Sequence, residues 1–321
     1  MSRTTASFVT TGREDMGISE EARYRVLRAA RELNYRPNLM ARSLRTKVTS
    51  TIALVSDTIA TEQYAGQAVY GALAAAAAHR HLLFIAETEG DPAVEGQLVE
   101  NLVDRQVDGF VYAAMWTREV HVPRVLRGHP LVLLNCTAKG WKVPAVLPDE
   151  VVAGRTAAEA LLDAGHRDGI WVLGEPAPHT FAGRERIDGI EKALAAAGTR
   201  LAGTLECGWW PIGAHEALAR FLDGGGRPRA LICLNDRIAM GAYQALQEHG
   251  VRVPAEVSVV SFDDSDLATW LRPQLSSVAI PHYELGRRAV ELLLDGESPN
   301  RVERVAMPLV PRASVGPPAG T

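Results

Sequence analysis

Beyond residue 50, short continuous apolar runs alternate with longer segments in which apolar residues recur every three or four positions. Runs of five or six apolar residues are typical of buried strands, and the second spacing is typical of helices with one buried face. The expected strands are 51–56, 82–87, 109–113, 131–135, 169–173, 230–234 and 257–262. The expected helices are 64–80, 93–106, 150–165, 183–198, 213–223, 236–249 and 282–295. This alternation indicates parallel sheets covered by helices on both faces.

These strand–helix units are too numerous for one comfortable sheet. We therefore expect an α/β protein with two doubly wound parallel-sheet lobes. The 321 residues are enough for two or three domains, each with its own core. Ligands of such sheets bind outside the carboxyl ends of the strands, so a cleft between the lobes is the expected ligand site.

The first fifty residues follow a different pattern. Residues 2–10 are expected to form a short helix with Ser2 as its N-cap, and a second helix is expected from Ser19 to about Asn34, before Pro37. This stretch holds ten Lys or Arg and five Asp or Glu, a net charge of +5. The other 271 residues hold 24 Lys or Arg and 33 Asp or Glu, a net charge of −9. A basic head on an acidic body favours phosphate binding, with a solvated Arg-rich helix face as the alternative.

Composition and missing motifs narrow the class of protein. The 47% hydrophobic and 22% charged fractions are ordinary, no apolar run reaches transmembrane length, and the first residues lack the apolar stretch of a secretory signal. Cys136, Cys207 and Cys233 have no metal-binding spacing and are expected to be reduced, buried thiols. The sequence has no phosphate-binding glycine loop, nucleophile elbow or zinc-protease motif. We therefore expect a cytoplasmic protein that is not an enzyme and uses no metal or cofactor.

Several short blocks occur in the order found in the lactose/galactose-repressor family of bacterial transcription regulators, and nearly the whole chain resembles that family. The head blocks are 2–9, 19–38 and 41–46, and the core blocks are 107–109, 162–167, 186–189, 235–236, 250–254 and 259–264. Each block is weak alone, but together and in order they are specific. The resemblance implies a periplasmic-binding-protein-like core of two lobes behind a partial, all-α helix-turn-helix head. The implied boundaries are 1–37 for the head, 38–50 for the hinge helix and linker, 51–148 plus 279–297 for the N-terminal lobe, and 149–278 plus 298–321 for the C-terminal lobe.

The resemblance makes residues 2–10 the recognition helix, which in this family enters the major groove. The family's first helix and turn are absent from the sequence, and Met1 stands where the family has a valine. Two explanations stay open: translation starts upstream of a valine codon that was written as Met, or the regulator is truncated. In either case we expect the chain as written to bind DNA weakly. The residues expected at DNA are Arg3, Thr4 and Phe8 on bases and Ser2 and Ser7 on phosphate.

Residues 41–46 resemble the family's hinge helix, which folds on DNA and pairs with its mate in a dimer. Leu44 matches the leucine that wedges into a base step from the minor groove. Ala41 is small enough for close approach of the two hinges, and Arg42 and Arg45 can neutralise phosphates. A contact of Leu44 with the core is the alternative.

The resemblance also implies an effector site at the ends of the strands. Its expected polar residues are Asp149, Arg186, Asn235, Asp236 and Asp263. Carboxylates accept hydrogen bonds from ligand hydroxyls, and a guanidinium donates a fork of N–H bonds. These groups suit a small polyhydroxylated or heterocyclic ligand.

Aromatic residues and one loop complete the expected site. Trp209 and Trp210 lie where the family has an aromatic that stacks on a ring, and we expect one of them to pack in the core. Trp116 and Trp141 are secondary candidates, and the first cleft loop adds Thr58, Ala60 and Tyr64. Aromatics beside hydroxyl-binding groups favour a sugar or sugar derivative over a purine.

The resulting hypothesis is a repressor with three partners: a near-palindromic operator, a small carbohydrate effector, and a second copy of the chain in a homodimer or tetramer, with no membrane contact. Effector binding would shift the lobes, separate the hinges and change DNA affinity, as an inducer or as a corepressor. A cytosolic small-molecule-binding protein without DNA activity is the alternative. A solute-binding protein disagrees with the missing signal and the basic head, and an enzyme disagrees with the missing nucleophile–base pair.

Overall fold

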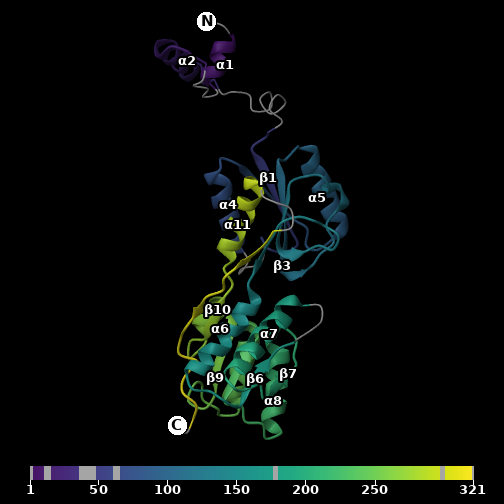
Figure 1. Cartoon of the computed structure of the whole chain (residues 1–321), viewed down its shortest axis with the longest axis vertical. Coiled ribbons are helices and arrows are strands. Elements are labelled where there is room, and N and C mark those ends of the chain that lie inside the picture. Colours follow the sequence, from purple (N-terminus) through teal and green to yellow (C-terminus); the bar gives the residue numbers. More distant parts are fainter. Residues whose placement is uncertain are drawn as a thin grey trace.

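The structure, a computed structural model, describes residues 3–10, 16–35, 48–60, 66–175, 180–296 and 301–319 of the chain. Figure 1 shows two α/β lobes and a helical segment at the N-terminus. The expected hinge helix falls in 36–47 and lies outside the described residues. The same holds for the expected site residues Ser2, Ala41, Arg42, Leu44, Arg45 and Tyr64.

Two helices, α1 (Arg3–Thr10) and α2 (Glu20–Glu32), form the described part of the head. Ser19 caps α2, because its Oγ accepts the backbone N–H of Ala22 at 3.3 Å. Val9 and Val26 are buried, and the two helices are in contact. A helix of eight residues is marginal in water by itself, so contact with α2 supplies the support that α1 needs. Both expected helices are confirmed within these bounds.

The N-terminal lobe contains a sheet whose described strands have the order β11-β5-β4-β3-β1-β2, with every pair of neighbours parallel. Its strands are β1 (Thr51–Ser56), β2 (Leu82–Glu87), β3 (Gly109–Glu119), β4 (Leu131–Thr137), β5 (Ala145–Pro148) and β11 (Val302–Val305). Its helices are α4 (Gly66–Ala78), α5 (Pro92–Asp104), the 3₁₀ helix η1 (Arg124–Leu126) and α11 (His282–Asp295). Successive residues of β1 pack into different cores: Ile52 and Leu54 lie with α4 and α11, whereas Ala53 and Val55 lie with α5. The sheet is therefore covered on both faces.

The C-terminal lobe repeats this plan with the strand order β12-β10-β9-β8-β6-β7, in which only the β10–β12 pair among the described strands is antiparallel. Its strands are β6 (Ile170–Leu173), β7 (Gly203–Leu205), β8 (Ala230–Cys233), β9 (Ser258–Asp263), β10 (Ser276–Ala279) and β12 (Leu309–Val310). Its helices are α6 (Glu150–Asp163), α7 (Phe181–Ala196), α8 (Pro211–Asp223), α9 (Asp236–Glu248) and α10 (Asp266–Trp270).

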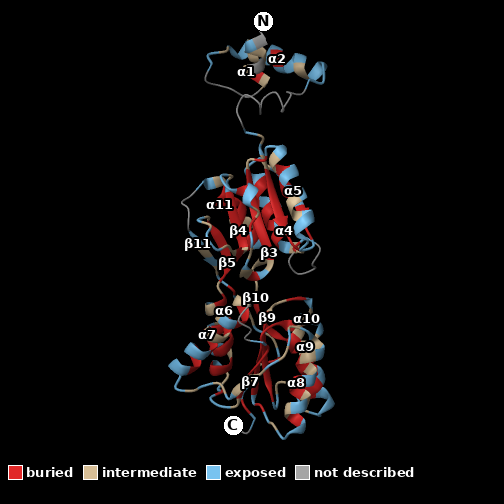
Figure 2. Cartoon of the chain, turned by 90° about the vertical axis from the view of Figure 1, so that its right-hand side faces the viewer, coloured by how far each residue is buried: buried red, intermediate tan, exposed pale blue. Residues whose placement is uncertain are grey.

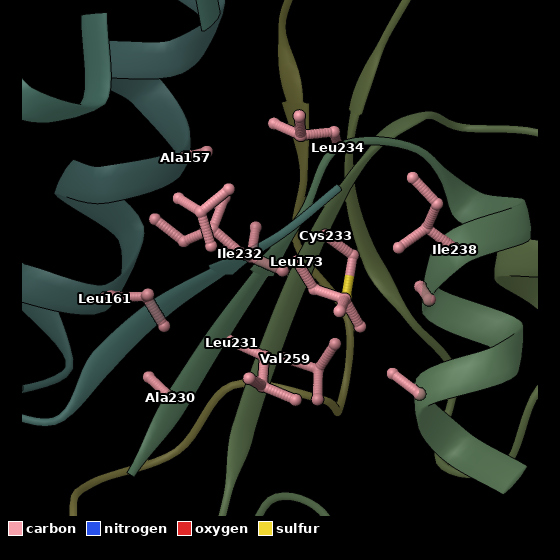
Figure 3. Close-up of a cluster of buried hydrophobic side chains, with 14 of the residues drawn as sticks. Ala157, Leu161, Leu173, Ala230, Leu231, Ile232, Cys233, Leu234, Ile238 and Val259 are labelled. Carbon is pink, nitrogen blue, oxygen red and sulfur yellow. The ribbon is translucent and has the colours of Figure 1, made fainter. Parts of the chain in front are cut away.

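One continuous core fills the C-terminal lobe. Figure 2 shows buried strands between helices whose outer faces are exposed, with α6 and α7 on one side and α8 and α9 on the other. In Figure 3 the β8 residues Leu231 and Ile232 lie between the helix that carries Leu161 and the helix that carries Ile238. Both lobes are thus doubly wound, as expected.

The chain crosses between the lobes in three described segments: after β5, after β10 and between β11 and β12. The second crossing returns α11 to the N-terminal lobe, where it packs on α4. The expected boundary at 298 is wrong for β11, because Val302 to Val305 pair in parallel with β5 of the N-terminal lobe. Only the chain after this strand joins the C-terminal lobe, through β12.

Candidate functional site

A cavity of about 470 Å³ lies between the lobes and is lined by residues of both. Its volume is typical of small-molecule sites. The N-terminal lobe contributes Thr58, Met115, Trp116, Thr117, Asn135 and Pro148. The C-terminal lobe contributes Glu150, Thr180, Ala182, Arg186, Trp209, Trp210, Asn235, Arg237 and Asp263. Ile280 lies in the crossing segment after β10, and His282 begins α11. Many of these residues end or follow a strand, which is where the sequence predicted the cleft.

Arg186 of α7 lines this cavity with only 2% of its surface exposed. Its Nε donates to Glu150 Oε2 at 2.6 Å and its Nη2 to Oε1 at 3.1 Å, so the two side chains form a bidentate pair. Its Nη1 donates to the carbonyl of Leu234 and lies 3.8 Å from Asp263 Oδ1. The guanidinium also lies 4.5 Å from the ring centre of Phe262. Glu150, which the sequence analysis did not select, is therefore the main partner of the expected arginine.

Asp263 ends β9 and points a partly exposed carboxylate into the cavity. Its φ of 103° lies in the region that L-residues rarely adopt, and the following Asp264 also has a positive φ, 52°. Burial raises the pKa of Asp263 above its ordinary range, while Arg186 opposes the shift. Arg186, Asp263 and the amide of Asn235 are three expected residues that meet at the cavity.

Two tryptophans of the C-terminal lobe line the cavity in different ways. Trp209 packs against the hydrophobic core, whereas Trp210 is 63% exposed, with the Arg237 guanidinium 4.6 Å from its ring centre. On the opposite wall Trp116 is 52% exposed and carries Arg118 at 4.7 Å from its ring. Two exposed tryptophans thus line the cavity, one from each lobe, each with an arginine over its ring.

Trp141, the other secondary candidate, is not a lining residue. It packs against the core of the N-terminal lobe, and the Arg127 guanidinium lies 5.4 Å from its ring. Trp141 therefore stabilises the core of the N-terminal lobe and does not line the cavity.

The first cleft loop is held by carboxylates of its own lobe. Asp57 Oδ1 accepts the backbone N–H groups of Thr58 at 2.7 Å and Met115 at 2.9 Å. Ala60 donates its N–H to Glu87 Oε2 at 3.2 Å and is not a lining residue. Of the three expected loop residues, Thr58 alone is described at the cavity, and Tyr64 lies outside the described part of the chain.

Asn235 begins α9 and lines the cavity, but much of its side chain is already bonded. Its Oδ1 accepts the N–H of Ile238 at 2.7 Å, which caps the helix, and its Nδ2 donates to the carbonyl of Trp209 at 3.4 Å. Asn135 of β4 has a similar arrangement, with Nδ2 on two carbonyls at 3.0 Å and Oδ1 accepting Thr117 Oγ1 at 2.6 Å. These two amides therefore shape the walls of the cavity that they line.

Two expected carboxylates, Asp149 and Asp236, are not among the lining residues. Asp149 caps α6, because its Oδ1 accepts the N–H of Val152 at 3.3 Å, and the next residue, Glu150, reaches Arg186 instead. Asp236 is fully buried behind the wall. Neither carboxylate lines the cavity, because each bonds groups of its own lobe instead.

An ion pair joins the lobes beside the cavity. Arg304 of β11 lies in the N-terminal lobe, and its two Nη atoms donate to the carboxylate of Glu185 on α7 at 2.9 and 3.1 Å. Glu185 precedes Arg186 in the chain. The pair is partly exposed, so it adds little stability, but it links the sheet of one lobe to the helix that carries the buried arginine of the other.

His282, at the start of α11, gives the fold a dependence on pH. Burial lowers its pKa from 6.5 to about 4. The unfolded chain therefore binds this proton more readily than the folded one, and stability is lost as the pH falls from about 6.5 to about 4. We expect a loss of about 3 kcal/mol over that window, which His282→Gln removes. Urea unfolding at several pH values measures this loss of stability, with exposed His121→Gln as the control. If stability changed with pH in the same way in the wild type and in His282→Gln, His282 would not be the cause of the loss.

The described head places few of the expected DNA-contacting side chains. Thr4 is exposed on α1 and Phe8 is partly buried, whereas the side chains of Arg3 and Ser7 lie outside the description. Within the ranges given above, no cluster of three or more His, Cys, Asp or Glu is placed to hold a metal ion. None of the helices in those ranges has the length and apolar character to cross a membrane.

Comparison with known proteins gives concordant matches. Residues 158–315 match the family described as "Periplasmic binding protein-like domain". The chain is 32% identical over 301 residues to the ribose operon repressor of Haemophilus influenzae, covering 92% of this chain and 88% of that protein. The transcriptional regulator CelR in complex with cellobiose matches with a TM-score of 0.70 at 26% identity, covering 98% and 96% of the two chains.

A further solved structure agrees in fold. The lac repressor dimer bound to operator and an anti-inducer matches with a TM-score of 0.76, covering 98% of this chain and 95% of that one. At 23% identity this likeness concerns the fold alone.

Proposed function

Because this chain belongs to the lactose/galactose-repressor (LacI/GalR) family of transcriptional regulators, we propose that it is a sequence-specific DNA-binding repressor controlled by a sugar or sugar derivative. The observation that carries the effector part is the cavity between the lobes, which Arg186, Asp263, Asn235 and the exposed Trp210 all line. A carboxylate and an amide bond hydroxyls, and an indole face packs against the C–H face of a sugar ring. We further propose that the chain acts as a homodimer or tetramer and binds a near-palindromic operator.

Strand β3 offers a route from the cavity to the linker. Its end contributes Met115, Trp116 and Thr117 to the cavity. Immediately before its start, Asp108 Oδ1 accepts the N–H of Thr49 at 2.8 Å and the Thr49 Oγ1 hydroxyl at 3.0 Å. Thr49 lies where the chain enters the lobe after the linker. A ligand that shifts the end of β3 would therefore act on the residue that anchors the linker.

The effector part is tested by thermal unfolding of the full chain with D-ribose, cellobiose and adenine. The two sugars are chosen because one relative is named for the ribose operon and another was solved with cellobiose. A sugar at 100 times its Kd raises stability by about 2.7 kcal/mol. A rise with a sugar and none with adenine is expected, and the reverse would refute the sugar assignment.

The DNA part is tested by selecting duplexes from a random library with the full chain and with a version that carries an upstream first helix. Fluorescence anisotropy then gives operator affinity with and without the stabilising sugar. A coupling of about 1–3 kcal/mol, or 5- to 150-fold in affinity, is expected in either direction. A chain that binds sugar but selects no DNA in either version would be a small-molecule-binding protein without regulatory activity.

A further inference from the structure

We infer that Asp236 is a positioning residue for the effector site, which fixes the backbone that aims Asp263 into the cavity. The inference rests on the proposed function to the extent that Asp263 is a ligand-binding residue. It gives a role to a buried carboxylate that does not line the cavity.

Asp236 bonds two different segments of the wall. From the first turn of α9 its Oδ2 accepts the backbone N–H of Ser265 at 2.7 Å and the Ser265 hydroxyl at 2.8 Å. Its Oδ1 accepts the hydroxyl of Ser277, on β10, at 2.8 Å. The carboxylate is fully buried, so water does not compete for these bonds. One side chain thereby ties a helix start to the turn after β9 and to the neighbouring strand.

That turn contains two consecutive strained residues. Asp263 and Asp264 have φ values of 103° and 52°, and L-residues occupy this region only when surrounding contacts hold them there. Asp264 donates its N–H to Ser277 Oγ at 2.9 Å, and the Ser277 hydroxyl donates its own hydrogen bond to Asp236 Oδ1. Arg312 also forms an ion pair with the Asp264 carboxylate at 2.6 Å.

The direction of the Asp263 side chain follows from these anchors. The two residues after it are held to Asp236, Ser265 directly and Asp264 through Ser277. The carbonyl of Asp263 itself accepts the N–H of Ile280 at 3.3 Å. Because these hydrogen bonds hold the turn, the Asp263 carboxylate stays 3.8 Å from Arg186 and lines the cavity.

A double-mutant cycle separates positioning from general stability. Asp236→Asn keeps the shape but turns an amide donor toward the hydroxyl and N–H donors of the network. D-Ribose and cellobiose affinities are measured by calorimetry at 15 °C on the full chain, for Asp236→Asn, Asp263→Asn and the double variant. We expect each single change to lower affinity at least tenfold, and the double variant to bind no more weakly than Asp263→Asn. Losses that multiply, or wild-type affinity in Asp236→Asn, would overturn the inference.

Two controls and one ligand-free measurement complete the test. Ser277→Ala should weaken binding and Ser277→Thr, which keeps the hydroxyl, should restore it, whereas Asp188→Asn, at a half-exposed position, should bind like the wild type. Without ligand, amide hydrogen exchange at Asp264 and Ser265 should accelerate at least tenfold in Asp236→Asn. Unchanged exchange would refute the positioning role even if neither sugar binds, whereas unchanged affinity in Asp263→Asn would refute only the proposed ligand contact.

Discussion

Arg186→Ala is expected to lower the free energy of unfolding by about 3–5 kcal/mol and to abolish sugar binding. The substitution leaves the buried carboxylate of Glu150 without its bidentate partner and the carbonyl of Leu234 without its donor. Glu150 is 2% exposed, so its carboxylate loses a charged partner that compensates its desolvation. Urea unfolding and calorimetry on the same preparations measure the two effects.

Replacing both charges distinguishes the structural from the functional loss. In Arg186→Met/Glu150→Leu the buried Glu150 carboxylate is removed together with its partner, and only the partly exposed Asp263 loses a neighbouring cation. We expect most of the lost stability to return, less about 1–3 kcal/mol for the unbonded Leu234 carbonyl. Sugar binding should stay absent, because Met offers no donors. The exposed pair Lys192–Asp188 supplies the control: Lys192→Ala should cost no more than about 1 kcal/mol. Recovery of binding in the double variant would show that the guanidinium has no part in ligand recognition.

The amino-acid sequence predicted the long elements because burial and periodicity act locally in them. Strands 51–56 and 82–87 and helix 282–295 have the expected bounds. It did not predict β11, whose sequence Val-Glu-Arg-Val has no apolar run and forms a strand only because β5 offers an unpaired edge. Strands β7 and β12 escape prediction because, with three and two residues, they are too short to show an apolar pattern.

The sequence predicted a site residue where its place at the end of a strand decides its role. Asp263 directly follows an apolar strand, and Arg186 was suggested by the family resemblance; both line the cavity. An aspartate that caps a helix, such as Asp149, looks the same in sequence as one that binds a ligand. The distinction between Asp149 and Glu150 depends on which of two neighbouring side chains the first turn of α6 directs at α7, and spacing alone does not contain that information.

Gly154→Ala is expected to destabilise the C-terminal lobe by about 3 kcal/mol and to weaken sugar binding, although alanine is the better helix former. Gly154 lies inside α6 where α7 passes closest to it. A Cβ there would lie 2.0 Å from the carbonyl oxygen of Arg186, and backbone cannot move aside as the end of a side chain can. On the facing helix Gly189 has the same relation to the carbonyl oxygen of Val151, also at 2.0 Å. The two glycines therefore set the distance between the helices that bring Glu150 and Arg186 together.

Gly96→Ala is the matched control, because Gly96 also lies inside a helix, α5, but its Cβ would meet nothing within 4 Å. Because only helix propensity changes there, the free energy of unfolding of this variant should rise by about 0.5–1 kcal/mol. Urea unfolding and calorimetry of both variants measure the difference in sign. If Gly154→Ala were as stable as Gly96→Ala, the close approach of α6 and α7 would not be what holds the buried pair in register. If it lost stability but kept its sugar affinity, the helices would separate without disturbing Arg186, and the cavity would depend on Asp263 and the tryptophans instead.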